Sequence, residues 1–267
     1  MTDADPAARR ADPGVEPAAG AGVVVVTPTY NEAENVETLL RAVRTVLPAA
    51  RVLVVDDDSP DGTAELAEKV AADIGGIDVL RRPGKDGLGS AYRAGFQRVL
   101  AGDADVVVSM DTDMSHDPAA LPELLRVLAS GADAVIGSRY VPGGATVDWP
   151  LHRRLLSRWG NRYTSLVLGL QLRDCTSGYR AYRAEALRAI EPASTEAEGY
   201  AFLTELVRRL VGRGYRVLEC PIVFEDRRYG QSKMSGRIIA ESMLRVTGWG
   251  VRDLVGGRTR ARRQPHR

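Results

Sequence analysis

The chain has 267 residues, 44% hydrophobic and 27% charged, which is enough to bury the core of one large domain. Its formal net charge of +1 provides no global field that would select nucleic acid. No apolar run approaches the roughly 20 residues needed to span a bilayer, and two cysteines are too few for a disulfide framework, so the composition is typical of a protein of the reducing cytoplasm.

The two ends of the chain differ in composition from the part between them. Residues 1–22 are rich in Ala, Pro, Gly and Asp, without periodicity and without the pattern of a secretion signal. We therefore predict a disordered tail there, and a second, basic tail over 258–267, which holds five Arg and no acid. Between them we expect a folded domain over 23–236, followed by a C-terminal amphipathic helix over 237–257.

Strand-like and helix-like segments alternate through the first half of the folded part. Apolar or β-branched runs predict strands at Val23–Val26, Val52–Val55, Asp78–Leu80, Asp105–Met110 and Ala134–Gly137. Segments with helical spacing lie between them. This alternation predicts an α/β fold in which a mostly parallel central sheet has helices on both faces.

Helix signals follow several of these strands. Asn31 with Glu34 fits a capping box, and Asp117 before Pro118 fits an N-cap followed by proline at the first helical position. A later helix carries apolar residues at helical spacing, which we expect to be core; they are Leu151, Leu155, Leu156, Trp159, Tyr163, Leu166 and Val167.

Polar groups collect at the carboxyl ends of four predicted strands. They are found in 28–32, in Asp56–Asp58, in Asp111–Asp113 and at Ser138-Arg139. Ligands of parallel α/β sheets bind beyond these strand ends. The fourfold recurrence predicts a site at one edge of the sheet.

Asp111 and Asp113 flank a single residue at the end of a predicted strand. Two carboxylates this close can converge on one hard cation, and oxygen ligands with open positions suit Mg²⁺ or Mn²⁺. A solvated turn with a helix cap would also explain the pair. The apolar strand before it and the helix start after it favour a site.

Three other motif interpretations compete with this one. Asp57 to Glu68 matches much of a calcium loop, although a strand precedes it where a helix is required. The segment from Met110 to Ser115 is similar to an aspartyl-phosphatase loop, but the only downstream lysine, Lys233, comes after the acidic pair instead of before it. The glycine-rich stretch 84–95 lacks a P-loop ending and is better explained by a turn and close helix packing.

The second half of the chain is basic. Arg153, Ser157 and Asn161 are four residues apart, share a helix face and could cradle a phosphate. Residues 174–180 form a polar loop, and 226–233 combine two Arg, a Gly, a hydroxyl and a Lys in a possible anion-binding loop. The chain has three Lys against 33 Arg, so Lys85 and Lys233 stand out.

Assembled in order, these segments resemble the family 2 glycosyltransferases with a GT-A fold, and among them the polyprenyl (dolichyl) phosphate mannose synthases. The resemblance spans about Val23 to Gly236. The segments that carry it are Pro28-Thr29-Tyr30-Asn31-Glu32, Val55-Asp56-Asp57-Asp58-Ser59-Pro60-Asp61-Gly62-Thr63, Gly87-Leu88-Gly89-Ser90-Ala91-Tyr92, Asp111-Thr112-Asp113, Gly137-Ser138-Arg139-Tyr140, Thr176-Ser177-Gly178-Tyr179-Arg180 and Tyr229-Gly230-Gln231-Ser232-Lys233.

This resemblance implies a GDP-mannose donor, a polyprenyl monophosphate acceptor and Mg²⁺ or Mn²⁺ as cofactor. It implies that the metal loop holds the cation and the sugar diphosphate; Ser115 stands where the family usually has Gln, so we expect a bridging water there. The implied residues are Pro28, Tyr30, Glu32, Val55, Asp57, Asp111, Thr112, Asp113, Arg139, Arg227 (or Arg228) and Lys233 for the nucleotide sugar, Arg139, Arg153 and Ser157 for the lipid phosphate, Asp111, Asp113 and Ser115 for the metal, and Asp111, Asp113, Arg139 and Lys233 for catalysis.

The expected reaction is a single in-line displacement that inverts the sugar and gives a β-linked mannosyl phosphate. A lipid monophosphate has a second pKa of about 6, so it needs no protein base at neutral pH. Two alternatives stay open: a UDP-sugar-dependent glucosyl or N-acetylhexosaminyl transferase acting on the same lipid, and a non-catalytic nucleotide- or metal-binding module.

We expect the protein to lie peripherally on the cytoplasmic face of a membrane, directly or through a separate membrane-anchoring protein, with no nucleic-acid partner. Ile239, Met243 and Val246 share one face of the C-terminal helix, with Trp249 at its edge. That face could dock at the interface while the basic tail meets anionic lipid. It could equally pack on the catalytic domain.

Overall fold

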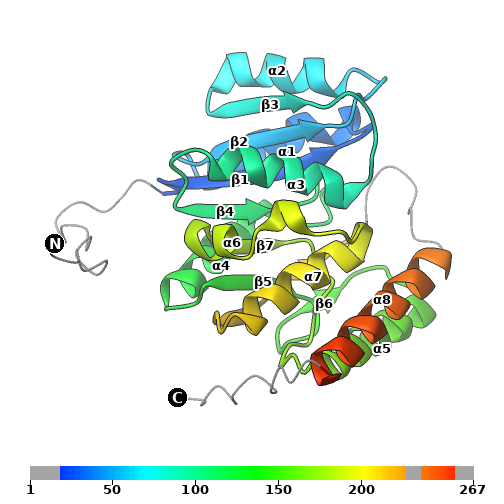
Figure 1. Cartoon of the computed structure of the whole chain (residues 1–267). Coiled ribbons are helices and arrows are strands. Elements are labelled where there is room, and N and C mark those ends of the chain that lie inside the picture. Colours follow the sequence, from blue (N-terminus) through cyan, green and yellow to red (C-terminus); the bar gives the residue numbers. More distant parts are fainter. Residues whose placement is uncertain (1–18, 227–235, 256–267) are drawn as a thin grey trace, which may run out of the picture.

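The computed structural model describes residues 19–226 and 236–255 (Figure 1). Within these residues a seven-stranded sheet has the order β3-β2-β1-β4-β7-β5-β8. A separate parallel pair joins β6 (Ala145–Thr146) to β9 (Val223–Phe224). The strands of the large sheet are β1 (Val23–Thr29), β2 (Arg51–Asp56), β3 (Ile77–Arg81), β4 (Val106–Ser109), β5 (Ala134–Ser138), β7 (Arg180–Arg183) and β8 (Val217–Pro221).

The sheet is parallel except for β7. Strands β3, β2, β1 and β4 pair in parallel, as do β5 and β8. Strand β7 is antiparallel to both β4 and β5, so β5 runs in the same direction as β4. The four strands whose ends carry polar clusters therefore end at one edge of the sheet, as the sequence predicts, and the predicted α/β class is confirmed.

Helices cover both faces of the sheet and enclose two apolar cores. The core on one face includes Leu39, Val70 and Leu124, and that on the other includes Tyr92, Phe96 and Phe202. The first face carries α1 (Ala33–Val46), α2 (Thr63–Ile74) and α4 (Leu121–Ala129), and the second carries α3 (Leu88–Leu100), α6 (Ala184–Ala189) and α7 (Gly199–Gly212); short 3-10 turns lie at Pro118–Ala120 and Pro192–Ser194.

Glycine lets α3 approach the sheet closely. A Cβ at Gly95 would lie 2.6 Å from Cγ1 of Val26 and 2.9 Å from Cγ2 of Val55. A larger residue would push α3 away from β1 and β2. The glycine-rich stretch thus serves helix packing, as the sequence suggests.

Two helices lie side by side away from the sheet, α5 (Leu151–Val167) and α8 (Gly236–Val255) (Figure 1). The hydroxyls of Tyr163 and Thr247 are 2.7 Å apart, and Val246 is buried between neighbours. A Cβ at Gly250 would lie 2.5 Å from Cγ1 of Val167, so the helices touch closely there. Ile239, expected on the same face as Val246, has a side chain outside the described part.

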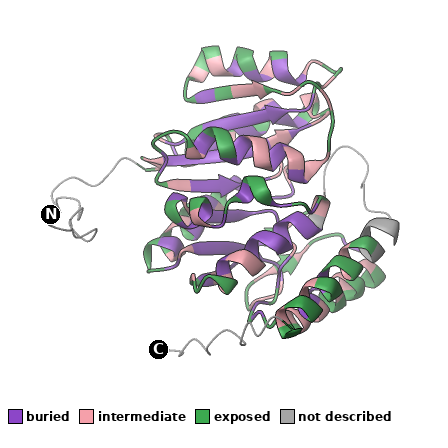
Figure 2. Ribbon diagram, in the orientation of Figure 1, coloured by how far each residue is buried: buried purple, intermediate pink, exposed green. Residues whose placement is uncertain are grey.

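The apolar stripe of α5 is not core, and that prediction is wrong. Its large side chains are exposed, in contrast to the buried sheet (Figure 2). Periodicity correctly identified an apolar face, but in the described structure α8 meets it at Tyr163 and Val167 while the leucines and Trp159 stay exposed. The exposed fractions are 67% for Leu151, 56% for Leu155, 45% for Leu156, 52% for Trp159 and 71% for Leu166.

Two local predictions also need correction. The N-terminus of α1 is not closed by Asn31 and Glu34; instead Asp61 accepts from the amide of Ala33, and Thr63 accepts from that of Glu32. The long-range contact replaces the local one because the β2–α2 loop lies against this turn. Residues 19–22, predicted as tail, form a turn that is hydrogen-bonded to Ala49 and Asp105. Residues 1–18 and 256–267 lie outside the described residues.

Candidate active site

Two cavities meet at the sheet edge where the polar clusters gather. One, of about 440 Å³, lies over the ends of β1 and β2 and is called here the donor pocket; its size suits a small-molecule ligand. The other, of about 150 Å³, lies between the end of β5, α5 and α8 and is called here the acceptor pocket. Asp111 and Asp113 line both. The acidic pair therefore sits at the junction of the two cavities.

The metal loop, Asp111–His116, has a defined shape. The amide of Asp111 donates to Nδ1 of His116 at 3.2 Å, and the amide of Ser115 donates to Oδ1 of Asp113 at 3.1 Å. Met114 has a φ of 61°, an uncommon conformation for a residue with a side chain, of a kind that clusters at functional sites. The loop thus holds both carboxylates on the cavity side.

His116 and Gly178 constrain Asp111 from either side. His116 is fully buried and stacks on Tyr179, and burial lowers the pKa of the imidazole, which keeps it neutral. A Cβ at Gly178 would lie 3.2 Å from Oδ1 of Asp111, so glycine allows this close approach. Tyr92 donates to the same oxygen at 3.4 Å. Sequence reasoning missed His116 because its role depends on the fold of the loop.

The donor set of this loop fits a hard divalent cation. Among the described residues no group of three or more His, Cys, Asp or Glu could hold a metal ion. Two carboxylates, Asp111 and Asp113, are nevertheless sufficient where substrate phosphates and waters complete the octahedron, as is usual for Mg²⁺. Ser115 is buried beside them and lines the acceptor pocket.

The donor pocket brings together most of the predicted nucleotide residues. Asp57 is paired with Arg82 at 2.5 Å, and Arg82 also donates to Ser90 at 2.6 Å. Burial raises the pKa of Asp57 against the opposing effect of Arg82. The predicted residues that line this pocket are Pro28, Tyr30, Glu32, Asp57, Asp111, Thr112 and Asp113.

Among the predicted nucleotide residues that the structure describes, Val55 and Arg139 lie outside the donor pocket; Arg139 lines the acceptor pocket instead. The side chain of Val55 is fully buried in the core beneath α3 and lines neither pocket. Lys85, in contrast, stands out in the sequence as a rare lysine, but the sequence assigns it no site. Its ammonium lies 3.9 Å from the centre of the Tyr30 ring, and it lines the donor pocket, which places a cation where a nucleotide phosphate could lie.

Arg139 forms one wall of the acceptor pocket. Its guanidinium makes two 2.7 Å contacts with the carboxylate of Asp174, and its amide donates to the same group at 3.1 Å. Burial raises the pKa of Asp174, but the ion pair and hydrogen bonds from Arg139 outweigh it and hold that pKa below its usual value. This pair is buried on both sides, with 6% and 0% of the side chains exposed.

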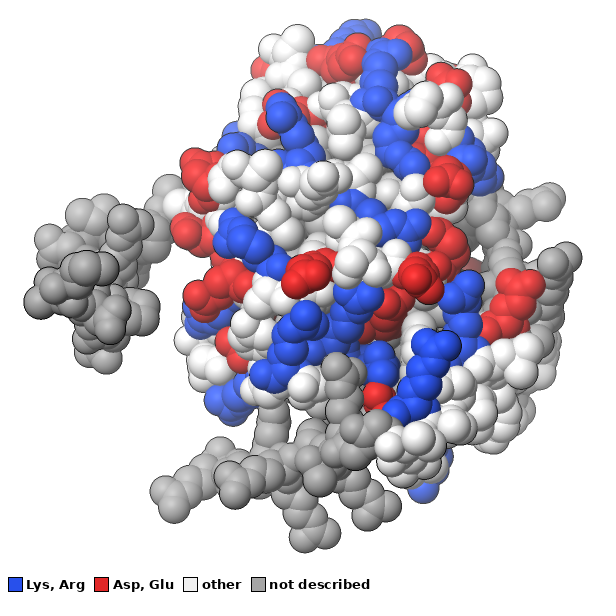
Figure 3. Space-filling view, viewed as in Figure 1, with Lys and Arg blue, Asp and Glu red and all other residues white. Residues whose placement is uncertain are grey.

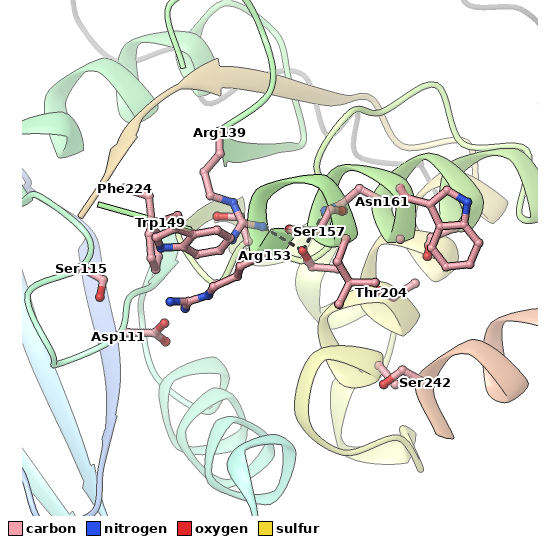
Figure 4. A pocket seen from close by; sticks show the side chains of 18 of the residues that line it. Asp111, Ser115, Arg139, Trp149, Arg153, Ser157, Asn161, Thr204, Phe224 and Ser242 are labelled. Atoms are coloured by element: carbon pink, nitrogen blue, oxygen red, sulfur yellow. Dashed lines mark hydrogen bonds between the residues drawn. The ribbon is translucent and has the colours of Figure 1, made fainter. Parts of the chain in front are cut away.

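Arg153 lines the same pocket and is held differently. Its guanidinium is 3.9 Å from the centre of the Trp149 ring and 2.8 Å from a carboxylate oxygen of Asp226. Figure 4 shows its side chain between Trp149 and Asp111. Trp149, Phe224 and Asp226 also line this pocket. These three were not predicted, since their proximity depends on how β9 returns to the site.

The predicted face of α5 does line the acceptor pocket. The Tyr140 hydroxyl donates to Oγ of Ser157 at 2.6 Å, and the Asn161 side chain donates to Thr176 at 3.1 Å. The hydroxyl of Ser157 therefore keeps its own proton for an anion. Farther from the acidic pair, the lining becomes apolar, with Leu156, Trp159, Met243 and Val246 from α5 and α8.

The buried Arg180 shapes the polar loop between α5 and β7. It is fully buried and donates to the carbonyls of Cys175, Ser177 and Leu203 at 2.6–2.7 Å. The loop that carries Thr176 and Gly178 into the site is thereby tied to α7. Arg227, Arg228 and Lys233, predicted to close over the phosphates, lie outside the described residues.

The structure shows that the calcium-loop interpretation of Asp57 to Glu68 is wrong. Asp57 pairs with Arg82, and Glu68 pairs with Arg81 on the outer surface of α2. Asp61 accepts hydrogen bonds from Ala33 and Thr63. These acids serve different partners and do not converge on one point.

The comparisons with known proteins agree with this geometry. Residues 24–191 match the protein family described as Glycosyl transferase family 2. The chain is 48% identical over 229 residues to the undecaprenyl-phosphate mannosyltransferase of Micrococcus luteus, covering 86% of this chain and 94% of that protein. It is 46% identical over 230 residues to the polyprenol monophosphomannose synthase of Mycolicibacterium smegmatis, covering 86% and 87%.

A solved structure supports the fold. A mannosyltransferase from Pyrobaculum calidifontis, in complex with GDP-mannose and Mn²⁺, superposes with a TM-score of 0.60 at 18% identity, covering 88% of this chain and 65% of that one. At this identity the likeness speaks for the fold alone. The GT-A fold implied by the resemblance is confirmed, and so is the resemblance itself.

Proposed function

This chain belongs to glycosyl transferase family 2, and from that premise we propose that it is an inverting mannosyltransferase. It moves mannose from GDP-mannose to a polyprenyl monophosphate and gives β-linked polyprenyl phosphate mannose. The relatives at 46–48% identity carry names of this activity. The proposal extends that activity and its acceptor to this chain, and takes GDP-mannose as the donor from the sequence resemblance.

One observation carries the proposal: the acidic pair lies where the donor pocket meets a second cavity whose lining changes from charged to apolar along α5 and α8. The donor pocket offers Lys85, Tyr30 and Asp57 for a nucleotide. The acceptor pocket begins with Arg153 and Ser157 and ends among apolar side chains of α5 and α8. An acceptor with a charged head and a hydrocarbon tail would need a pocket that begins with a cation and continues along apolar side chains.

In the reaction, an oxygen of the acceptor phosphate attacks the anomeric carbon of mannose. The bond from that carbon to the β-phosphate oxygen of GDP breaks, and the leaving diphosphate takes the electron pair. Because attack and departure are in line, the sugar inverts. The phosphate acceptor is largely dianionic at neutral pH, with a second pKa of about 6, so no side chain must remove a proton.

The chain's residues divide this work. Asp111 and Asp113 would hold Mg²⁺ or Mn²⁺, with Ser115 through water, and the cation would supply charge stabilisation for the leaving diphosphate. Arg153 and Ser157 orient the acceptor phosphate. Arg139 adds positive charge to the same wall while Asp174 fixes its position. Arg227 and Lys233 stay predicted cations for the diphosphate.

The outer face of the α5–α8 pair supports contact with a membrane surface. In addition to the exposed leucines of α5, Leu244 of α8 is 72% exposed and Leu254 is 81% exposed. Figure 3 shows uncharged side chains over much of this region, with basic and acidic ones beside them. Exposed apolar surface with cations at its border suits an anionic lipid interface. Within the described residues, no helix has the length and apolar character to cross a bilayer.

We therefore place the protein peripherally on the cytoplasmic face, with α5 and α8 against the lipid. The alternative that the predicted face of α8 packs on the protein fits its described residues, because Val246 is buried and Met243 and Val246 line the acceptor pocket. The exposed Leu244 and Leu254 lie outside that predicted face. A separate membrane-anchoring protein stays a prediction.

The test is a panel of nucleotide sugars incubated with a short-chain polyprenyl phosphate, with and without EDTA. We expect mannosyl phosphate lipid from GDP-mannose alone, with loss of product in EDTA and its recovery on adding Mg²⁺ or Mn²⁺. Product from a UDP sugar would establish the alternative transferase. Metal-dependent nucleotide binding without any product would instead establish a binding module.

A further inference from the structure

The two arginines on the acceptor side differ in what their carboxylate partners can do. Asp174 is completely buried, contacts Arg139 through both oxygens and also accepts from the amide of Ser177. It cannot leave without stranding a buried charge. Asp226 is 36% exposed, its partner Arg153 is 25% exposed, and one 2.8 Å contact joins them.

Asp226 contacts Arg153 at the place in the acceptor pocket where the proposed acceptor phosphate would bind. Arg153 and Ser157 lie one helical turn apart on α5 and line the acceptor pocket together with Asp226. The face of the Arg153 guanidinium is covered by Trp149. The carboxylate of Asp226 thus already engages the cation that faces the incoming anion.

Exchange requires only a side-chain movement. The chain just before Asp226 is held to the metal loop, because Phe224 bridges His116 and the amide of Glu225 contacts the carbonyl of Ser115 at 3.4 Å. The main chain before Asp226 can therefore stay in place while the Asp226 carboxylate, which is partly exposed, moves off Arg153. A phosphate dianion carries more charge than the carboxylate that it replaces.

We propose that Asp226 is a built-in competing anion that occupies Arg153 until the acceptor phosphate displaces it. This inference rests on the proposed acceptor chemistry and adds to it a residue that sets acceptor affinity. Asp226 weakens binding of any phosphate-headed ligand, so that weak anions of the cell do not hold the site.

The experiment compares Asp226→Asn with Glu225→Gln. Glu225 is adjacent, exposed and outside the acceptor pocket, so its variant removes the same charge without touching Arg153. Binding of a short-chain prenyl monophosphate to the full chain is measured by calorimetry without donor, and KM and kcat are then measured with GDP-mannose.

We expect Asp226→Asn to tighten binding and lower the acceptor KM by about two- to fivefold, the range for a partly exposed ion pair. The donor KM of Asp226→Asn should stay at the wild-type value. Glu225→Gln should leave acceptor binding and both Michaelis constants at their wild-type values. Weaker binding of the prenyl phosphate by Asp226→Asn than by wild type would show that Asp226 orients Arg153 and would overturn the inference. Equal binding by the two proteins, or no binding by either of them, would also overturn it. Tighter binding without mannose transfer would support it while refuting the proposed function.

Discussion

The two sides of the site are built in different ways. On the donor side, the side chains of Thr29, Asp56 and Ser59 bond to one another at 2.6–2.7 Å at the ends of two strands. On the acceptor side, α5 and α8 lie apart from the sheet and expose apolar side chains (Figure 1, Figure 2). Under the proposed function, the protein itself completes the donor side, whereas a lipid surface completes the acceptor side.

The largest expected effect concerns the Arg139–Asp174 pair on the acceptor side. Like the donor-side cluster, this pair is buried and closed by hydrogen bonds within the protein. Asp174→Asn should lower the free energy of unfolding by about 3–5 kcal/mol, because it leaves a buried guanidinium uncompensated. Urea unfolding at pH 7 measures this. Asp103→Asn, which breaks an exposed pair with Arg51, should leave the free energy of unfolding nearly unchanged.

The pH dependence of the same pair has a defined sign. The folded pKa of Asp174 lies below its ordinary value of 3.8, so the carboxylate stabilises the fold above that pH. This contribution is lost as the pH falls from 3.8 through the folded pKa. The difference in the free energy of unfolding between wild type and Asp174→Asn should therefore become smaller below pH 3.8. A difference that stays constant as the pH falls would contradict an ion pair between Asp174 and Arg139.

The junction between the two sides is tested at the metal loop. Asp113→Asn keeps the acceptor for the Ser115 amide but removes a charge, and we expect kcat to fall by about 100- to 1000-fold, as for loss of an electrostatic stabiliser. Steady-state transfer assays measure this. Asp58→Asn, in an exposed loop residue with a φ of 58° that suits Asn, should retain activity. Normal metal-dependent turnover by Asp113→Asn would remove the loop from the mechanism.

The acceptor side alone is tested at Arg153. Arg153→Ala should raise the acceptor KM by about tenfold, the scale of one charge-assisted hydrogen bond, while the donor KM stays constant. Arg162→Ala, on an exposed position of the same helix, serves as the control. Equal increases in both Michaelis constants would show that the two pockets are not separate in function.

The smallest expected effect concerns the apolar face of the helix pair. Leu155→Ser should lower binding to anionic phospholipid vesicles by about fivefold, because only part of one leucine's burial is lost. Sedimentation with vesicles measures this, and Val147→Ser, an exposed residue outside both helices, should bind normally. Vesicle binding unaffected by Leu155→Ser would break the comparison on which the acceptor side rests.

Much of the fold and half of the site could be read from the sequence. Runs such as Val23–Val26 predict strands, and parallel connections bring their ends to one edge, so the strand-end residues of the donor pocket could be predicted. The parts of its lining that come from α3, α7 and α8 could not. Strand β7 and its antiparallel insertion were not predicted, although they decide how far Gly178 lies from Asp111. The polar loop before β7 was noticed only as irregular.

Local order along the chain determined the strands, the helices, the amphipathic faces and the acidic pair, because periodicity and neighbouring residues are sufficient for them. Tertiary structure alone decided the partners. Asp174 lies 35 residues from Arg139, and Asp226 lies 73 residues from Arg153. It also left the leucines of the α5 stripe exposed, since a pattern of apolar residues specifies a face but not what that face will touch.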